Sequence, residues 1–415
     1  MLRPTQVALS RASTIGWIGL GAMGHPMALN LFTKTYLASQ NSSSSSAPGY
    51  MICEQDDVRV SSFLSKLRER GGGELAGKVE RVENGREMSK MASRILTMLP
   101  STPQVESVYL DSANGILSGL QTLSKDEPPL LPLATSDQNE GIEQLSSSAT
   151  ISPGPSTPSP VVPPLDSSTT ISPTTSSQRE SSPHTLLIDC TTLSPVSAAN
   201  IAKNIHESTS GKVVMLDAPV SGGTVAAKKG ELTIMFGSPS NEATELALPL
   251  LQTMAGRDRI VYCGENGKGV GVKVCNNLIL AINQIALAEG LALGNSLGID
   301  PILLHNVINT SSGQSWSSRV NTPLEEISGS PGERGYDGGF QTRLMLKDAG
   351  LALESAAALD LPIPMTWAAK SIYEAVCREG KGEWSTKDFS VVYEWIKKKQ
   401  LEGVERGWKA DPTET

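Results

Sequence analysis

Short apolar runs separated by amphipathic stretches dominate the first half of the chain. They predict buried strands at Thr14–Ile18, Tyr50–Cys53, Arg94–Met98, Thr185–Ile188 and Val213–Leu216, with Leu232–Phe236 as a further candidate. Helical periodicity predicts helices over Pro26–Tyr36 and Val58–Arg70, between the early strands. Because strands that alternate with helices favour a parallel sheet, we expect an α/β domain with a doubly wound sheet.

The pattern becomes helical after Gly271. The run Val272–Gly298 carries apolar residues almost all round a helix, as a buried helix does. Further helices are predicted at Pro301–Ile308, Gln341–Leu359, Pro364–Glu379 and Phe389–Lys398. We therefore expect an N-terminal domain over residues 14–265, an all-helical C-terminal domain over 266–400 and a tail at 401–415.

Two segments lack the apolar residues of a folded core. The first covers about residues 39–49 and contains the serine run 42–46. The second covers about 121–184, is rich in Ser, Thr and Pro, and contains Thr-Ile-Ser-Pro twice. Such sequence cannot bury enough apolar surface to offset its ordering entropy, so we expect disordered insertions. The longer one is either an inert surface insertion or a phosphorylated or partner-binding tether.

Composition narrows the functional classes. The net charge of −8, from 35 basic and 43 acidic residues, gives no electrostatic basis for binding nucleic acid. No apolar run approaches the roughly 20 residues that span a bilayer, so no membrane association is expected. The five cysteines and four histidines are scattered and form no CxxC pair. We therefore expect no metal site, no disulfide framework and a reducing compartment.

The N-terminal residues 1–13 contain Arg3 and Arg11 together with hydroxyl residues, and no acid precedes Glu54. This composition is typical of a short mitochondrial presequence, which would direct the protein to the matrix. The alternative is an untargeted terminus on a cytoplasmic protein.

A glycine-rich motif directly follows the first predicted strand and opens a helix. Its residues are Gly19, Leu20, Gly21, Ala22, Met23 and Gly24. In this setting the glycines permit a tight turn, close approach of a pyrophosphate and close helix–strand packing. The motif therefore predicts a Rossmann-type dinucleotide site, with the pyrophosphate at the helix N-terminus.

Glu54 ends the second predicted strand, where this fingerprint places an acidic residue. The spacing is longer than usual, and the serine run before the strand accounts for the excess. A carboxylate there can accept hydrogen bonds from the adenosine ribose and would repel a 2′-phosphate. Since Gln55-Asp56-Asp57 follows without an arginine, we expect NAD rather than NADP.

The stretch from Gly267 to Asn277 places a lysine where a glycine-rich turn enters the long apolar helix. Residues three and four apart on a helix are neighbours, so Lys273, Asn276 and Asn277 can face one point. A lysine near a helix N-terminus feels the positive end of the macrodipole, which favours its neutral form. These residues suit proton transfer beside an anionic substrate.

Five sequence blocks together resemble one family. They are Ile18–Ala28, Asp217–Gly223, Gly269–Asn277, Ser311–Ser318 and Gly339–Asp348. In this order they resemble the 3-hydroxyisobutyrate dehydrogenases of the β-hydroxyacid dehydrogenase superfamily, which is related to 6-phosphogluconate dehydrogenase. The match runs from about Thr14 to Lys399 and is interrupted by the two insertions.

The resemblance implies roles for individual residues. Lys273 would be the catalytic general acid/base. The substrate would contact Ser221, Gly222, Gly223, Asn276 and Asn277. The cofactor would contact the glycine-rich motif, Glu54, Leu99, Pro100, Gln104, Thr192 and Lys347, although Gln104 differs in type from its counterpart in relatives. Trp316 is either part of the family block or an ordinary core aromatic. The family also implies a homodimer or homotetramer formed through the helical domain.

The expected activity is NAD-dependent oxidation of 3-hydroxyisobutyrate to methylmalonate semialdehyde, a step of valine catabolism, which the Ser311–Ser318 block favours. A second hypothesis is a relative acting on tartronate semialdehyde, glyoxylate or another small β-hydroxyacid. A third, from a different class, is a catalytically inactive scaffold of the same fold. A 6-phosphogluconate enzyme is disfavoured because the helical domain lacks a basic cluster for a sugar phosphate.

Overall fold

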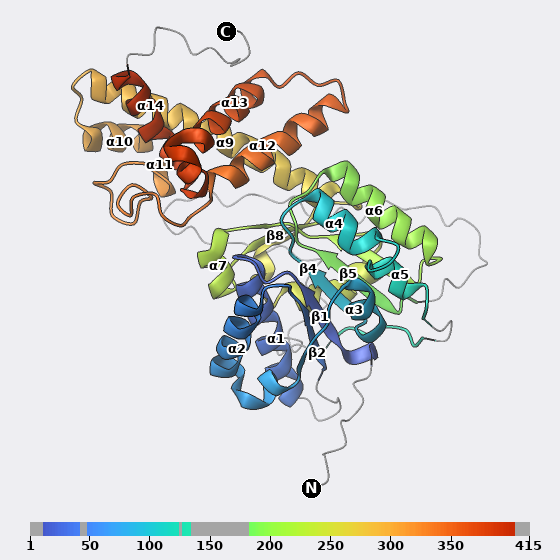
Figure 1. The fold of residues 1–415 in the computed structure, drawn as a ribbon. Helices are drawn as coiled ribbons and strands as arrows, with labels where there is room; N and C mark the ends of the chain where they lie inside the picture. Colours follow the sequence, from blue (N-terminus) through green and yellow to red (C-terminus); the bar gives the residue numbers. More distant parts are fainter. Residues whose placement is uncertain (1–10, 42–47, 124–126, 134–181, 403–415) are drawn as a thin grey trace, which may run out of the picture.

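The computed structural model of the protein describes residues 11–41, 48–123, 127–133 and 182–402. These residues form a six-stranded parallel sheet, a small three-stranded sheet and a group of C-terminal helices (Figure 1). The predicted α/β fold, with an N-terminal doubly wound sheet followed by helices, is confirmed.

The large sheet has the strand order β3-β2-β1-β4-β5-β6, and all its pairs are parallel. Its strands are β1 (Ile15–Ile18), β2 (Tyr50–Cys53), β3 (Val79–Arg81), β4 (Arg94–Thr97), β5 (Thr185–Asp189) and β6 (Val213–Asp217). Successive strands are added toward one edge of the sheet from β1 to β3 and toward the other edge from β4 to β6, so the strand order reverses between β1 and β4. In open α/β sheets, ligands bind at the carboxyl ends of the strands beside this switch point.

The small sheet continues from the end of β6. It contains β7 (Val220–Ser221), β8 (Thr233–Phe236) and β9 (Ile260–Tyr262), with β7 antiparallel and β9 parallel to β8. A bridge between Asp217 and Gly237, the residue after β8, joins the middle strand of this sheet to the end of β6. The candidate strand predicted at Leu232–Phe236 is therefore real but belongs to this second sheet.

Helices cover both faces of the large sheet because successive strand residues point to opposite sides. On β2, Tyr50 and Ile52 enter one core, whereas Met51 and Cys53 enter the other. The first core packs under α1 (Gly24–Gln40), α2 (Asp57–Gly77) and α8 (Asn241–Leu251). The second packs under α3 (Gly85–Met91), α4 (Thr102–Leu110), α5 (Ile116–Leu120) and α6 (Pro195–Ser208). The short helix α7 (Gly223–Lys229) packs on α1.

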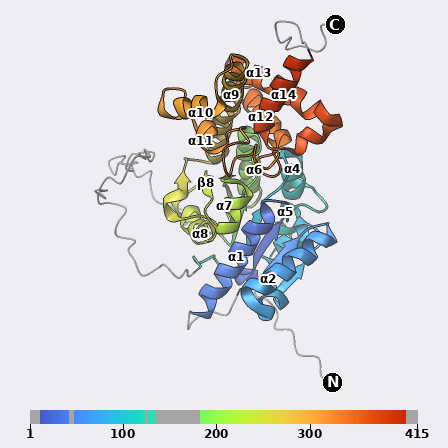
Figure 2. The ribbon, with the colours of Figure 1, turned by 90° about the vertical axis from the view of Figure 1, so that its left-hand side faces the viewer.

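The C-terminal helices form a separate group beyond the large sheet (Figures 1 and 2). They are α9 (Lys268–Ser296), α10 (Pro301–Thr310), α11 (Trp316–Val320), α12 (Thr342–Ala357), α13 (Pro364–Arg378) and α14 (Val392–Leu401), with 3-10 turns η4 (Glu379–Thr386) and η5 (Phe389–Val391). They share a third core, and α9 packs against all the others. Val270 and Val274 of α9 also enter the second core of the sheet.

Helix α9 begins at Lys268, four residues before the predicted start. Gly267 precedes it with φ +86°, and a Cβ there would lie 2.7 Å from the Pro195 carbonyl oxygen. Only glycine fits this position, which lets the helix start close against α6. Lys273 is consequently the sixth residue of the helix.

Arg11–Ser13 form a 3-10 turn, η1, on the folded domain. The Arg11 guanidinium donates to Thr185 Oγ1 (2.7 Å) and to the Ser89 carbonyl oxygen (3.1 Å), and pairs with Glu127 (3.2 Å). The boundary expected after residue 13 therefore moves to before Arg11. The rest of the expected presequence, residues 1–10, lies outside the described residues.

Part of the long insertion is packed rather than disordered. Leu130 is buried, and its N–H donates to the Pro183 carbonyl oxygen at 2.8 Å. The buried guanidinium of Arg94 donates to the Leu131 carbonyl oxygen at 2.5 Å. The expected disorder is thus wrong for residues 121–123, 127–133 and 182–184 of this insertion. It is also wrong for 39–41 and 48–49 of the shorter one, where α1 extends to Gln40 and the Gly49 carbonyl oxygen accepts from the Ile15 N–H. The expectations for 42–47, 124–126, 134–181 and 403–415 concern residues outside the described ones.

Among the described helices, α9 is long and apolar enough to cross a membrane by length and composition. No run of this length and composition was expected from the sequence, whereas the expectation of no membrane association is not tested by length and composition alone. The most apolar window of α9 has a mean hydropathy of 1.4, and 44% of it is buried. The core helix of a folded domain meets the same criterion.

Candidate active site

The glycine-rich loop after β1 fits a pyrophosphate. Gly19 has φ +95°, and a Cβ there would collide with the Met98 carbonyl oxygen. A Cβ on Gly24 would collide with the Gly19 carbonyl oxygen, whereas one on Gly21 would meet nothing within 4 Å. No side chain caps the start of α1. In the first turn of α1 the His25 N–H already donates to the Gly21 carbonyl oxygen at 3.0 Å, and Pro26 has no N–H. The donors that a phosphate needs must therefore come mainly from the glycine-rich loop itself, beside the open space at Gly21.

Glu54 lies against this loop at the end of β2. Its Oε2 accepts from the Leu20 N–H at 2.7 Å, and its Oε1 accepts from the N–H groups of Gln55 (2.9 Å) and Asp56 (3.1 Å). A carboxylate has about four acceptor sites, so it can still accept ribose hydroxyls. Arg59 Nη1 lies 3.8 Å from Oε1, a neighbour that the tripeptide after Glu54 did not predict.

The loops after β4 and β5 meet next to the switch point, which lies between β1 and β4. The Leu99 N–H donates to Thr191 Oγ1 at 2.9 Å. Lys347, on α12, donates from Nζ to the Thr192 carbonyl oxygen at 2.7 Å. Three of the predicted cofactor residues, Leu99, Thr192 and Lys347, therefore belong to one contact network that joins the sheet to the helical domain.

Two other predicted cofactor residues, Pro100 and Gln104, are exposed. Pro100 is exposed beside Leu99. Gln104 is exposed on α4, and its Oε1 accepts a hydrogen bond from the Ser101 hydroxyl. The hydrogen bonds of Gln104 thus do not join it to the Leu99–Thr192–Lys347 network.

Lys273 is buried, with 7% of its surface exposed. Burial lowers the pKa of its ammonium, the nearby charge of Lys347 lowers that pKa further, and the charge of Asp348 opposes both. Because α9 begins at Lys268, Lys273 lies beyond the first turn, where the macrodipole effect fades. Desolvation, rather than the helix end invoked from the sequence, is the main cause of the lowered pKa.

The two asparagines of α9 are connected to α12 through the side chain of Asp348. The buried Asn277 donates from Nδ2 to Asp348 Oδ2 at 2.5 Å. Asn276, which is exposed, donates to Asn277 Oδ1 at 3.1 Å. Asp348 is itself buried, and its Oδ1 lies 3.4 Å from Lys347 Nζ. Asp348 was not predicted as a site residue, although it ends the late sequence block that contains Lys347.

Asp217 joins the predicted substrate loop to α9. Its two carboxylate oxygens accept from the N–H groups of Gly267 (2.7 Å) and Val270 (2.9 Å). The chain then continues through β7 to Gly222 and Gly223, which are exposed and have φ of +128° and +66°. The start of this loop therefore lies at the N-terminus of the helix that carries Lys273. Asp217 was missed as a structural link because its partners lie about 50 residues away.

The Ser311–Ser318 block serves a structural purpose in this chain. Ser315 and Ser318 form a reciprocal capping box at the start of α11, and Ser318 Oγ also donates to Asn309 Oδ1 at 2.8 Å. Trp316 is 52% exposed, so its interpretation as a core aromatic is wrong.

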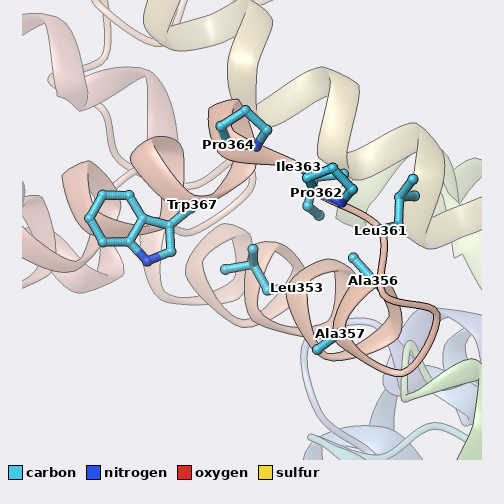
Figure 3. A pocket seen from close by; sticks show the side chains of 8 residues that line it. All are labelled: Leu353, Ala356, Ala357, Leu361, Pro362, Ile363, Pro364 and Trp367. Carbon is cyan, nitrogen blue, oxygen red and sulfur yellow. The ribbon is translucent and has the colours of Figure 1, made fainter.

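An apolar cavity of about 350 Å³ lies between α12 and α13 (Figure 3). It is lined by Leu353, Ala356, Ala357, Leu361, Pro362, Ile363, Pro364 and Trp367. It contains no titratable group and none of the predicted site residues. Within the described ranges, no group of three or more His, Cys, Asp and Glu side chains could hold a metal ion.

Two protein-family models match most of the chain. The NAD-binding domain of 6-phosphogluconate dehydrogenase matches residues 14–125 and 166–264. The NAD-binding region of NADP-dependent 3-hydroxyisobutyrate dehydrogenase matches residues 267–396. The two matches meet between β9 and α9. Because both models describe NAD-binding proteins, the predicted NAD cofactor is confirmed.

Individual relatives cover nearly the whole chain. The mitochondrial 3-hydroxyisobutyrate dehydrogenase of Homo sapiens is 38% identical over 95% of this chain and 89% of its own. An NAD-dependent L-serine dehydrogenase of Pseudomonas aeruginosa is 32% identical over 91% of this chain and 96% of its own. A solved 3-hydroxyisobutyrate dehydrogenase of Mycobacterium tuberculosis with L-serine is 26% identical, with a TM-score of 0.63 over 92% of this chain and 99% of that one. The chain therefore belongs to the 3-hydroxyisobutyrate dehydrogenase family, whose members are NAD-dependent hydroxyacid dehydrogenases.

Proposed function

We propose that the protein oxidises 3-hydroxyisobutyrate to methylmalonate semialdehyde with NAD, in valine catabolism. The observation that carries the proposal is Lys273, a buried lysine with a lowered pKa, next to the Asn277–Asp348 pair. Buried lysines are uncommon unless their charge is paired or their neutral form is used. Oxidation of an alcohol requires a group that accepts the hydroxyl proton, and a neutral amine can do so.

Lys273 acts as the general base. Its neutral Nζ takes the proton of the substrate hydroxyl as the carbon–hydrogen bond of the same carbon breaks. NAD, when bound, supplies the acceptor for the hydride. In the direction of reduction, the protonated Lys273 returns a proton to the aldehyde oxygen. Asn276 and Asn277 hold the reacting oxygen, and Asp348 fixes the orientation of the Asn277 amide.

The substrate carboxylate belongs at the loop after β7. Ser221 offers a hydroxyl, and Gly222 and Gly223 offer backbone N–H groups in positive-φ conformations that leave the backbone exposed. Successive N–H groups of this kind form concave anion sites. Asp217 links this loop to α9, so the carboxylate and the reacting hydroxyl of one small molecule can be held together.

L-Serine and a tartronate semialdehyde or glyoxylate type of substrate are the competing candidates. L-Serine shares the carboxylate and the hydroxymethyl group with 3-hydroxyisobutyrate and carries an ammonium in place of the methyl group. The serine dehydrogenase relative supports this second candidate. A catalytically inactive scaffold of the same fold would bind NAD without turnover.

The deciding experiment measures NADH formation with 3-hydroxyisobutyrate, L-serine and glycerate. We expect turnover to prefer 3-hydroxyisobutyrate and to fall by at least about a hundredfold in Lys273→Ala, since general acid–base groups contribute about 10²–10⁴. NAD binding, measured by calorimetry, should survive in that variant. The matched control is Lys268→Ala, which removes an exposed lysine of the same helix and should leave turnover unchanged.

Each other outcome has a distinct meaning. Preference for L-serine or glycerate would reassign the substrate and keep the mechanism. Full activity in Lys273→Ala would reject the lysine mechanism. NAD binding without turnover on any substrate would identify the scaffold.

For the cellular setting, we propose a homodimer or homotetramer in the mitochondrial matrix. The mitochondrial names of several relatives support this location. Fractionation of cells expressing the full chain tests it, and recovery with the cytosol would reject it.

A further inference from the structure

A buried hydrogen-bond network occupies the carboxyl ends of β4 and β5. Thr97 and Asp189, the last residues of these strands, are register partners. Asp189 Oδ1 accepts from Thr97 Oγ1 and from Thr191 Oγ1, each at 2.7 Å. Tyr109, from α4, lies with its hydroxyl 2.8 Å from Thr97 Oγ1. All four side chains are buried.

The chemistry of these groups orders every proton in the network. A threonine hydroxyl has one hydrogen, and Thr97 uses it toward Asp189, so Tyr109 must donate to Thr97. Thr191 also donates to Asp189, which leaves its lone pairs to accept from the Leu99 N–H at 2.9 Å. Asp189 is thus the common acceptor at the end of two chains of hydrogen bonds.

The second of these chains begins at Leu99, one of the predicted cofactor residues. Leu99 follows β4, and Thr192 is the residue directly after Thr191. The Thr192 carbonyl oxygen accepts from Lys347 Nζ at 2.7 Å. The network therefore ties the loop after β4, the loop after β5 and the helical domain together at one place.

The network buries the carboxyl group of Asp189, which is energetically unfavourable. Burial raises the pKa of Asp189 to about 7, and the negative charge of Asp217 adds to this shift. The other titratable neighbours, Tyr109 and Cys190, are also buried. Within the described part of the chain, Asp189 Oδ2 is buried without a hydrogen-bond partner. Buried carboxyl oxygens without partners are destabilising, so one at the end of β5, next to the loop that carries Leu99, indicates a functional constraint.

We propose that Asp189 and Thr191 are positioning residues, which hold Leu99 and Thr192 in the geometry that binds NAD. The proposal rests on the proposed function in one respect, the assignment of Leu99, Thr192 and Lys347 to the cofactor. Asp189 acts through Thr191 and does not itself touch the reacting atoms.

The test compares Thr191→Val with Thr191→Ser by calorimetric NAD titration, at a temperature where thermal unfolding shows each variant to be folded. Valine keeps the shape of threonine and removes the hydroxyl that links Leu99 to Asp189. We expect the Kd for NAD to rise about tenfold in Thr191→Val and to stay within about twofold in Thr191→Ser. The matched control is Thr253→Val, because the buried Thr253 hydroxyl donates to the Leu250 carbonyl oxygen, away from the network.

A purely structural role predicts a different result. It would lower the unfolding midpoint of Thr191→Val and leave the Kd of the folded variant unchanged, which would overturn the proposal. Lys347→Met separates this failure from a wrong cofactor assignment. If Lys347→Met weakens NAD binding and Thr191→Val does not, the positioning role alone is rejected. If neither variant changes the Kd, the cofactor assignment is rejected with it. Neither result depends on the identity of the substrate.

Discussion

Lys273 lies in a setting where neighbouring charges act on its pKa in opposite directions. Burial lowers the pKa and the nearby Lys347 lowers it further, while Asp348 raises it. The neutral amine is the form that accepts a proton in oxidation, and the ammonium is the form that donates one in reduction. The two directions should therefore respond to pH with opposite signs.

For oxidation, we expect kcat/KM to rise with pH to an inflection below 10.5, the ordinary pKa of a lysine. Asp348→Asn removes the charge that raises the Lys273 pKa, so the inflection should move to lower pH. For reduction, activity should fall as pH rises through the same value. Rates measured between about pH 6 and 10.5 check both directions.

The control for this shift is Asp337→Asn, which neutralises an exposed carboxylate paired with Lys387 in the same helical domain. Its profile should overlay that of the unmodified protein. An unchanged inflection in Asp348→Asn, or one moved to higher pH, would contradict the electrostatic account of Lys273.

At the scale of single elements, α9 depends on a residue from another part of the chain. Gly267, which precedes it, has no side chain to cap the helix, and the carboxylate of Asp217 accepts from the Gly267 and Val270 N–H groups instead. Asp217 also ends β6. One carboxylate therefore sets where the helix with Lys273 starts relative to the sheet.

Asp217→Asn should weaken this junction. An amide offers one acceptor oxygen, and its NH₂ group would face the second backbone N–H, which costs about 1–3 kcal/mol for a buried donor without a partner. We expect a lower unfolding midpoint together with a lower kcat, since α9 carries Lys273. Thermal unfolding and steady-state kinetics measure the two effects.

Asp300→Asn is the matched control. Asp300 caps the start of α10 at an exposed site by accepting from the Leu303 N–H at 2.7 Å, and asparagine is an equally good cap there. Its stability and kcat should stay close to those of the unmodified protein. An Asp217→Asn protein that behaves like Asp300→Asn would exclude the anchoring role.

How well the sequence predicted a strand depends on the length and burial of that strand. The strands β1, β2, β4, β5 and β6 were predicted to within one residue at each end, because each is a short apolar run buried on both faces. The strands β3, β7 and β9 were missed, since each is only two or three residues long and includes partly exposed residues. The start of α9 was placed late because Lys268-Gly269 lacks apolar periodicity and is held by Asp217.

At the scale of the whole molecule, large apolar side chains are exposed on neighbouring helices. Leu293 (63%) and Leu297 (68%) lie one turn apart at the end of α9, and Leu303 (58%) and Val307 (52%) lie one turn apart on α10. The two helices pack together through Gly294 and Leu304. Large apolar side chains exposed on two packed helices are typical of a subunit interface, which agrees with the proposed oligomer.

Replacing Leu303 and Val307 together with glutamate should disrupt that interface. Burying two charges against an apolar partner surface is unfavourable, so the mass in solution should fall toward that of one 43.9 kDa chain. Light scattering coupled to size exclusion measures the mass, and far-UV circular dichroism shows whether the helices remain. Leu401→Glu, at an 89% exposed leucine of α14, is the control. An unchanged mass in the double variant would exclude this surface.

The sequence by itself determined five strands of the large sheet, the helical character of the C-terminal half, the glycine-rich loop and the family, and it singled out Glu54 and Lys273 as candidate site residues. These features depend on local patterns, in which neighbouring residues carry the whole signal. Only the tertiary structure decided which distant groups meet: Asp217 with the start of α9, Asp189 with Thr97, Thr191 with Leu99, and Lys347 with Thr192. The last pair is separated by 155 residues, and no local pattern encodes a contact of that length. Burial, which lowers the pKa of Lys273 and raises that of Asp189, is likewise set by packing between elements.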